Sequence, residues 1–405
     1  MDGRSPTKAG HGALGAAPGC LTHVSLREHS SVLSADAVAS IPGRATVAAT
    51  ADYARRLQHI AHSEHFRDTH CPKVSSIGIG TFMGPATSDA DASYSSAIVR
   101  ATELGCNLID TAINYRHQRA ERCVGAALRT VCADTNRRNE LVVSTKAGYL
   151  PFDGELPQDA DRYLYEQYEE RLQLAPGEVV EKHCIAPAFL RDQVARSRVN
   201  LGLETIDVFY LHNPEEQLRF VDRASFESRL RAAMATLEES CQQGHIASYG
   251  LATWVAFRES KDHPQYLSLD EVVRWAVEVG GPRHHFRFLQ LPLNLKALEP
   301  YMLANQWYDG RWCTLLEVAQ AHGIHIVTSA PLLQGRILGR LPPPIQRAFA
   351  ALSSDVQRTV QFVRSIPGVG SVLVGMGRSQ HVEENLALAS LAPDTAAIQQ
   401  IFRHT

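Results

Sequence analysis

The sequence lacks the features that mark several classes of protein. Its eight cysteines include no C-x-x-C pair, and several stand inside apolar patterns, which favours reduced thiols over a disulfide framework or a zinc site. It has no run of about 18 apolar residues, and its N-terminus has no uninterrupted apolar core, so neither a membrane span nor a signal peptide is predicted. We therefore expect a soluble, cytoplasmic protein with no membrane partner.

An excess of charge of either sign is also missing. Lys and Arg number 40 and Asp and Glu number 43, which gives a formal net charge of -3 and a pI near 6.7. Such a balance provides no general attraction to nucleic acid. Of the 405 residues, 44% are hydrophobic and 20% are charged, which is enough for a large core. These totals allow one large domain with extensions, or two domains.

The first part of the chain differs from the rest. Residues 1 to about 45 are rich in Gly, Ala, Ser and His and show no sustained periodicity. This composition favours a disordered tail over an organelle-targeting peptide, because the segment is neither rich in arginine nor clearly amphipathic. A short helix is expected within residues 51–66. We therefore predict an N-terminal extension over residues 1–65 and a main domain over residues 66–405.

The main domain alternates two patterns. Eight short apolar or β-branched runs are each followed by a helical pattern, and the predicted strands are 74–81, 107–110, 141–146, 206–212, 246–253, 286–293, 324–332 and 371–376. Eight such units indicate a parallel sheet closed into a (β/α)8 TIM barrel, an α/β fold with its helices outside. The rival fold, a doubly wound open sheet, normally has G-x-G-x-x-G after the first strand, and "GIGTFMGP" lacks this motif.

One connection is far longer than the others. Residues 149–186 separate the third strand from the third helix, where a loop usually has about 2–6 residues. This insert is acidic and aromatic, and in a barrel it must lie at the C-terminal face. It is either a lid over the site or a helical insert that packs on the rim. For its His183-Cys184 pair, a structural role is favoured over contact with substrate.

Polar side chains follow five of the predicted strands. In chain order they are Asp110, Lys146, His212, Thr253 and Gln290. The C-terminal ends of barrel strands meet at one mouth, where the chemistry of such proteins is found. Each of these residues alone could be a cap, a rim charge or a structural histidine. Their joint placement indicates a catalytic site.

The chemistry of these groups suits proton transfer by Tyr115, which follows Asp110 by five residues. A free tyrosine has a pKa of about 10, and we expect the nearby Lys146 cation to lower the pKa of Tyr115. Asp110 would keep Lys146 charged and oriented. Tyr115 could then act as a general acid or base on a carbonyl or alcohol oxygen held by His212. None of these groups can supply a hydride, so a bound cofactor is required.

These residues stand in motifs that resemble those of the aldo-keto reductase superfamily. The resemblance runs from about Val74 to Leu391, through "SSIGIGT", "GCNLIDTAINY", "VVSTKAGY", "LETIDVFYLHNPE", "FLQLPLN" and "VGMGRSQHVEENL". It implies a TIM barrel and an NADP-dependent reduction of an aldehyde or ketone, with NADPH favoured over NADH. It also implies a catalytic tetrad with Tyr115 as proton donor, made up of Asp110, Tyr115, Lys146 and His212.

The resemblance also assigns residues to the cofactor. The implied contacts are Thr81, Thr253, Gln290, Ser329, Gly375, Arg378, Glu384 and Asn385. Gln290 matches the residue that bonds the nicotinamide carboxamide, and Glu384 and Asn385 match the pair that binds adenine. Arg378 lies where the 2'-phosphate is expected, and a planar guanidinium suits a phosphate. The alternative for Arg378 is a solvated side chain at the start of the last helix.

The sequence departs from the family pattern at two places. Ala252-Thr253 stands where relatives commonly have Ser-Asn, and Ser329 stands where many have an aromatic residue that stacks on the nicotinamide. These changes leave the tetrad intact. They bear on cofactor affinity and reaction rate.

The substrate is expected to be a small-molecule carbonyl compound held in a mostly apolar pocket. The predicted lining residues are Phe82, His117, Tyr149, Phe152 and Trp254. A competing hypothesis is an NADP(H)-binding regulatory protein with little turnover, to which the acidic insert and the N-terminal tail would give a surface for a protein partner. A metal-dependent hydrolase is disfavoured, because the histidines of "RHHF" open a strand and so fall on the opposite face. The sequence does not specify an oligomeric state.

Overall fold

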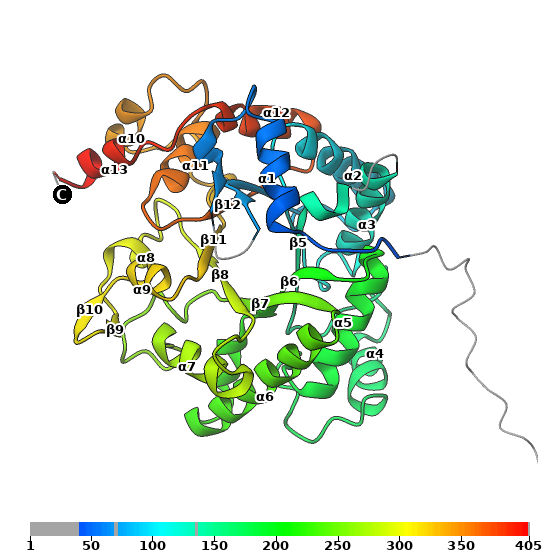
Figure 1. Ribbon diagram of the computed structural model, residues 1–405. Coiled ribbons are helices and arrows are strands. Elements are labelled where there is room, and N and C mark those ends of the chain that lie inside the picture. Colours follow the sequence, from blue (N-terminus) through cyan, green and yellow to red (C-terminus); the bar gives the residue numbers. More distant parts are fainter. Residues whose placement is uncertain (1–39, 69–71, 134–136, 404–405) are drawn as a thin grey trace, which may run out of the picture. The chain divides into compact units, whose positions relative to one another are not determined.

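The computed structural model describes residues 40–68, 72–133 and 137–403 of the chain. Eight parallel strands close into one barrel, in the order β11-β12-β3-β4-β5-β6-β7-β8, with the helices around it (Figure 1). The barrel strands are β3 (Ile77–Gly80), β4 (Leu108–Asp110), β5 (Val142–Ala147), β6 (Ile206–His212), β7 (Ile246–Ala252), β8 (Phe286–Pro292), β11 (His325–Ser329) and β12 (Ser371–Gly375). The predicted TIM barrel is confirmed.

Each barrel strand is followed by a helix, as the alternation predicts. These helices are α2 (Ser88–Glu103), α3 (Arg119–Cys132), α5 (Pro187–Leu201), α6 (Arg223–Gln242), α7 (Leu269–Gly280), α9 (Leu315–Ala321), α11 (Asp355–Ser365) and α12 (Ser379–Leu386). Five of them begin after a side chain that accepts a hydrogen bond from the backbone N–H three residues later, namely Thr87, Asp222, Ser268, Thr314 and Ser354. Such caps satisfy the free N–H groups of a first turn and fix where the helix starts.

Further short helices and strands lie outside the eight strand–helix units. They are α1 (Val47–Arg56), β1 (Phe66–Arg67), β2 (Val74–Ser75), α4 (Ala160–Leu164), α8 (Glu299–Met302), β9 (Gln306–Tyr308), β10 (Arg311–Cys313), α10 (Pro343–Ala348) and α13 (Thr395–Phe402). The helix predicted within 51–66 starts earlier, because the Thr46 hydroxyl accepts from Ala49 N and caps α1. The hairpin β9-β10 has no counterpart in the predicted elements.

Alternation along each strand decides which side chains enter the barrel. Leu108, Val142, Val208 and Phe288 belong to one buried cluster, whereas the residues that follow them, such as Ile109, belong to another, larger one. Successive side chains of a strand point to opposite faces, so every second residue faces inward. The last polar residues of β4, β5, β6 and β8 share this alternation and so also face inward, at the mouth of the barrel. They are Asp110, Lys146, His212 and Gln290.

Part of the predicted N-terminal extension packs on the barrel. Ala45 N donates to Asp207 Oδ1 at 2.6 Å, and the hydroxyl of the buried Tyr53 donates to Thr102 O at 2.7 Å. The described residues from 40 onwards form one compact unit. The disordered tail predicted for the first residues lies, up to residue 39, outside the described part of the chain.

The insert after β5 folds into a compact helical excursion. It contains α4 and a π-helical turn at Tyr165–Glu170, and Tyr168 is buried with its hydroxyl donating to Pro151 O at 2.6 Å. The chain then returns to β5, where His183 forms an isolated bridge with Tyr149. The two ends of the insert therefore meet beside the barrel mouth.

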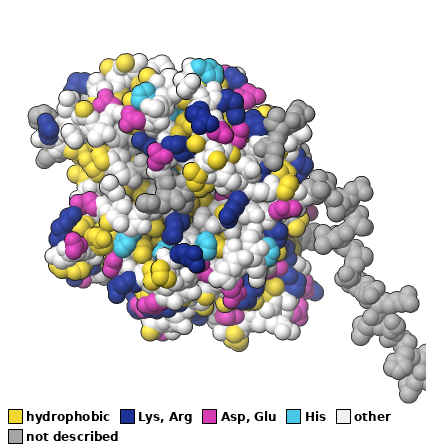
Figure 2. Space-filling view, viewed as in Figure 1, with side chains coloured by type: hydrophobic (Ala, Val, Ile, Leu, Met, Phe, Trp, Pro, Cys, Tyr) yellow, Lys and Arg dark blue, Asp and Glu magenta, His cyan; other side chains and the backbone are white. Residues whose placement is uncertain are grey.

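The surface shows mixed charge. On the face drawn in Figure 2, Lys and Arg side chains are interspersed with Asp and Glu side chains. No helix among the described residues has the length and apolar character needed to cross a membrane.

Candidate active site

A cavity of about 490 Å³ opens at the C-terminal ends of the barrel strands. Its volume lies in the range of small-molecule sites. Eleven residues predicted for catalysis, cofactor or substrate line it: Thr81, Phe82, Asp110, Tyr115, Tyr149, His212, Thr253, Trp254, Gln290, Ser329 and Gly375. Residues that lie more than 290 positions apart in the sequence are thus brought to one mouth.

A buried ion pair forms the floor of this cavity. Lys146 Nζ donates to Asp110 Oδ2 at 2.6 Å and to Thr111 O at 2.7 Å. Asp110 Oδ1 accepts from Ser144 Oγ at 2.7 Å and from Gln290 Nε2 at 3.0 Å. Burial lowers the pKa of Lys146, and the Asp110 carboxylate acts against this effect. The pair therefore holds a cation at a fixed place under the cavity.

Tyr115 lies above this cation. Lys146 Nζ is 5.2 Å from the centroid of the Tyr115 ring, which is the geometry of a cation–π contact. Burial, and then the Asp110 carboxylate, raise the pKa of Tyr115. The pKa of Tyr115 is therefore raised rather than lowered as expected, because burial penalises the tyrosinate and Lys146 Nζ is directed to Asp110 and Thr111 O. A hydroxyl that stays protonated at neutral pH is suited to donate a proton.

His212 ends β6 beside Tyr115. The ring centroids of Tyr115 and His212 are 5.9 Å apart, and those of Tyr149 and His212 are 5.1 Å apart. Burial, and then the Lys146 cation, lower the pKa of His212 well below its ordinary value. The imidazole is therefore neutral and offers one N–H donor. Its Nδ1 is buried and has no hydrogen-bond partner in the described structure.

Aromatic side chains form the walls of the mouth. Phe82 is 55% exposed and packs edge to face on Tyr115, with ring centroids 4.9 Å apart. Trp254 is 51% exposed, and its backbone N donates to Glu215 Oε1 at 2.6 Å. Glu215 is fully buried and is not among the predicted site residues. Its position three residues after His212 is the signal that could have identified it.

Two predicted pocket residues lie elsewhere. His117 and Phe152 pack on each other, with ring centroids 5.7 Å apart, and do not line the cavity. The cause is a turn at Arg116, His117 and Gln118, whose φ angles of 48°, 56° and 67° are left-handed. This turn directs His117 to the insert, where its carbonyl accepts from Gly154 N. The assignment of His117 and Phe152 to the substrate pocket is therefore corrected.

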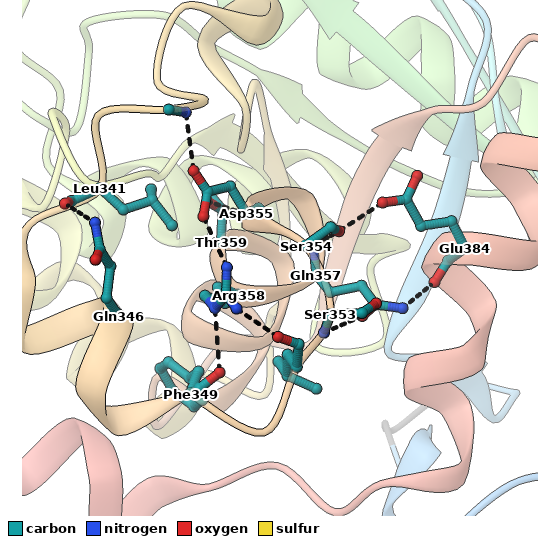
Figure 3. Close-up of polar contacts among 12 residues, drawn as sticks. Leu341, Gln346, Phe349, Ser353, Ser354, Asp355, Gln357, Arg358, Thr359 and Glu384 are labelled. Atoms are coloured by element: carbon teal, nitrogen blue, oxygen red, sulfur yellow. Dashed lines mark hydrogen bonds and ion pairs between the residues drawn. The ribbon is translucent and has the colours of Figure 1, made fainter.

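The three residues assigned to the far end of the cofactor surround the start and end of α12. Arg378 is exposed, precedes α12, and has no side-chain hydrogen bond or ion pair to any described residue. Glu384 Oε1 accepts from Ser354 Oγ at 2.5 Å, and Glu384 O accepts from Gln357 Nε2 at 2.7 Å (Figure 3). Asn385 is 2% exposed, and its Oδ1 has no partner among the described residues. None of the three lines the cavity, and of the two unpaired groups only the Arg378 guanidinium is exposed, because the Asn385 oxygen is buried.

No metal centre accompanies these groups within residues 40–68, 72–133 and 137–403, where no three His, Cys, Asp or Glu side chains are grouped to hold an ion. Of the two histidines in "RHHF", His285 instead pairs with Glu238, with Nδ1 and Oε2 2.6 Å apart, at the start of β8.

Comparisons with known proteins agree with this geometry. Residues 76–274 match the model of the aldo/keto reductase family. L-glyceraldehyde 3-phosphate reductase from Escherichia coli is 23% identical over 370 residues, which cover 82% of this chain and 89% of the relative. An NADH-specific methylglyoxal reductase from the same organism is 29% identical over 204 residues, which cover 49% of this chain and 53% of the relative.

Among solved structures, an aldo/keto reductase from Klebsiella pneumoniae in complex with NADP and acetate has the same fold. Its TM-score is 0.55 at 18% sequence identity, and the match covers 84% of this chain and 95% of that chain. The closed parallel barrel, the family match and these relatives lead to one conclusion. The chain belongs to the aldo-keto reductase superfamily of oxidoreductases.

Proposed function

We propose that this protein reduces an aldehyde or ketone to an alcohol with NADP(H). The observation that carries the proposal is the meeting of Tyr115, His212 and the Lys146–Asp110 pair at one cavity. Tyr115 is the proton donor, because its hydroxyl is protonated at neutral pH and it lines the cavity. Lys146 and Asp110 are not free to act as acid and base on substrate, because they are bonded to each other.

The proposed reaction divides the work between these residues. The nicotinamide, when bound, supplies the hydride that the carbonyl carbon gains. The His212 N–H holds the carbonyl oxygen, which keeps the carbon in place and stabilises the developing negative charge. Tyr115 transfers its proton to that oxygen, and the Lys146 cation beside its ring stabilises the tyrosinate that remains. A proton from solvent then restores the Tyr115 hydroxyl.

The residues present fit a nicotinamide dinucleotide. Gln290 and Thr253 lie in the cavity for the carboxamide end, while Arg378, exposed and without a partner among the described residues, offers a cation for the far end. A 2'-phosphate on Arg378 would make NADPH the preferred cofactor. The NADP in the Klebsiella pneumoniae structure supports this preference, whereas the E. coli methylglyoxal reductase is NADH-specific by name.

Steady-state oxidation of NADPH with a panel of small aldehydes and ketones tests the proposal. Tyr115→Phe is expected to lower kcat by about 10²- to 10⁴-fold, the usual contribution of general acid catalysis, while the NADPH Kd from fluorescence titration stays the same. Tyr301→Phe, a partly buried tyrosine on α8, serves as the matched control with unchanged kcat. Unchanged turnover in Tyr115→Phe would overturn the assignment.

The same measurements separate this function from a regulatory role. Tight NADPH binding by the wild-type protein with negligible turnover on every carbonyl compound would favour an NADP(H)-binding regulatory protein instead.

A further inference from the structure

The insert contacts the strand end that carries His212 through one buried side chain, His183. Its Nε2 lies 2.8 Å from the His212 carbonyl oxygen. Because a carbonyl oxygen only accepts, Nε2 carries the proton and donates it. On either side of His183, Cys184 N donates to Gly148 O at 2.7 Å and Lys182 O accepts from Leu150 N at 2.8 Å. His183 therefore stands where the two ends of the insert are joined.

The other ring nitrogen of His183 is fixed as well. Its Nδ1 lies 2.9 Å from Gln217 Nε2, and Arg229 Nη1 donates to Gln217 Oε1 at 2.6 Å. Since arginine only donates, the Gln217 amide must present its oxygen to Arg229 and its NH₂ to His183. Burial also lowers the pKa of His183 to about 4, so the ring is neutral with one proton. Every donor and acceptor from Arg229 to the His212 carbonyl is thus determined.

The orientation of His212 depends on this network. No hydrogen bond to its buried Nδ1 orients the ring. Its imidazole is held instead by its backbone and by the rings of Tyr115 and Tyr149, and the Tyr149 ring also packs on His183 with centroids 5.1 Å apart. The Tyr149 hydroxyl accepts from Asn213 Nδ2 at 2.9 Å. Two of these three supports, the His212 backbone and Tyr149, are therefore in contact with His183.

The local backbone is shaped to bring His183 to this place. A Cβ on Gly148 would overlap the His212 carbonyl oxygen and come within 2.8 Å of His183 Nε2. Glu181 and Lys182, which precede His183, have left-handed φ angles of 47° and 65°. Such angles cost about 1–2 kcal/mol per residue for side chains other than glycine. The hydrogen bonds of His183 Nε2 to His212 O and of Cys184 N to Gly148 O offset this cost.

We propose that His183 is a positioning residue that fixes the depth and angle of His212 and so couples the insert to the tetrad. This inference rests on the proposed function, in which His212 holds the substrate oxygen. His183 itself does not line the cavity. A small displacement of a group that orients substrate costs about 100-fold in rate.

Two variants of His183 test this role. His183→Phe keeps a ring but has no donor for the His212 carbonyl, and it is expected to lower kcat about 10- to 100-fold with an unchanged NADPH Kd. His183→Gln retains an N–H donor and is expected to recover most of kcat. His65→Gln is the matched control, because His65 is also buried and its Nε2 donates to a backbone carbonyl, Gly105 O, at 2.9 Å. This control lowers stability but leaves kcat unchanged.

A second measurement does not depend on turnover. Histidine-selective ¹⁵N NMR should show the Nε2-protonated form of His183, and Gln217→Glu, which places an acceptor at Nδ1, should raise the pKa of His183. The other titratable groups that face His183 are His212, Tyr149 and Glu216. His183→Phe should also shift the His212 ring resonances.

These outcomes separate the two proposals. Wild-type protein without activity on any carbonyl compound would overturn the proposed function, while the His212 resonances would still report whether His183 positions that ring. Unchanged His212 resonances and kcat in a folded His183→Phe variant would overturn the positioning role. If that variant fails to fold, His183→Gln and Gln217→Glu test the positioning role instead. An unchanged His183 pKa in Gln217→Glu would contradict the hydrogen-bond network from Arg229 to the His212 carbonyl.

Discussion

Single residues at the mouth owe their properties to burial. Lys146 and Asp110 are both less than 5% exposed and bonded to each other, and such a pair is stabilising only as a pair. Lys146→Met leaves the Asp110 carboxylate buried without its cation. We expect this variant to lose about 3–5 kcal/mol of unfolding free energy and most of its turnover.

The double variant Lys146→Met with Asp110→Asn is the control for this prediction. It removes the uncompensated charge, so it should regain most of the stability in urea unfolding but none of the turnover. Equal stability of the single and double variants would contradict the account of the pair.

We expect Glu215 to make the free energy of unfolding depend on pH. Its Oε1 accepts from Trp254 N and Val255 N, while its buried Oε2 has no partner in the described structure. Burial raises the pKa of Glu215 from 4.5 to about 7. Because the folded pKa lies above the unfolded one, the contribution of Glu215 to stability is fully present below about pH 4.5 and is lost as the pH rises through about 7.

We therefore expect Glu215→Gln to be more stable than the wild-type protein at pH 8, by up to about 3 kcal/mol, and to differ less at pH 5. Urea unfolding of both proteins at the two pH values measures this difference. Identical changes with pH in the two proteins would show that Glu215 is not the source.

Arg378 is predicted to select the cofactor. Its guanidinium is exposed and free of partners in the described structure, and a charge-assisted bond to phosphate contributes about 1.5–3 kcal/mol. Arg378→Ala should raise the Kd for NADPH about 10- to 100-fold and leave the Kd for NADH unchanged. Isothermal titration with the two cofactors measures both values. An equal loss of affinity for NADH would show that Arg378 does not bind the 2'-phosphate.

At the scale of elements, the alternation of side chains along each strand explains why these site residues could be predicted from the sequence. Asp110 and Lys146 follow inward-facing Leu108 and Val142 by two and four positions, so period-2 alternation directs them to the mouth. The backbone conformation of the loops could not be predicted from such a pattern. His117 was predicted to line the pocket, but the left-handed turn at Arg116 and His117 brings it to the insert, where its carbonyl accepts from Gly154 N, and no local pattern reveals that contact.

The junction of β5 with the insert is predicted to tolerate no side chain. Gly148→Ala would force apart the His212 carbonyl and His183, at a cost of roughly 2–3 kcal/mol. Gly154→Ala, in the same insert, has no heavy atom within 4 Å of the added Cβ, although its φ of 76° adds a smaller strain. Thermal unfolding should show the larger loss for Gly148→Ala, together with reduced kcat. Equal losses in the two variants would contradict the close approach.

At the scale of the whole molecule, the segment from Ala45 to the end of α1 packs on the barrel. The melting temperature of a protein that lacks residues 1–38 is the reference for this contact. Deleting residues 1–57 should lower it by several degrees, because Ala45 and Tyr53 lose their bonds to Asp207 and Thr102. Differential scanning calorimetry of the two truncated proteins measures this, and equal melting temperatures would show that α1 adds nothing to the barrel.

The sequence by itself determined the fold and the identity of the candidate tetrad. Eight strand and helix patterns define the barrel, and the polar residues that end its strands are local features of those patterns. Only the tertiary structure decided the state of these groups. Burial sets the raised pKa of Tyr115 and of Glu215, and the contact of His183 with the His212 carbonyl joins segments 29 residues apart. Desolvation and long-range packing depend on every element that surrounds a residue, so no local pattern encodes them.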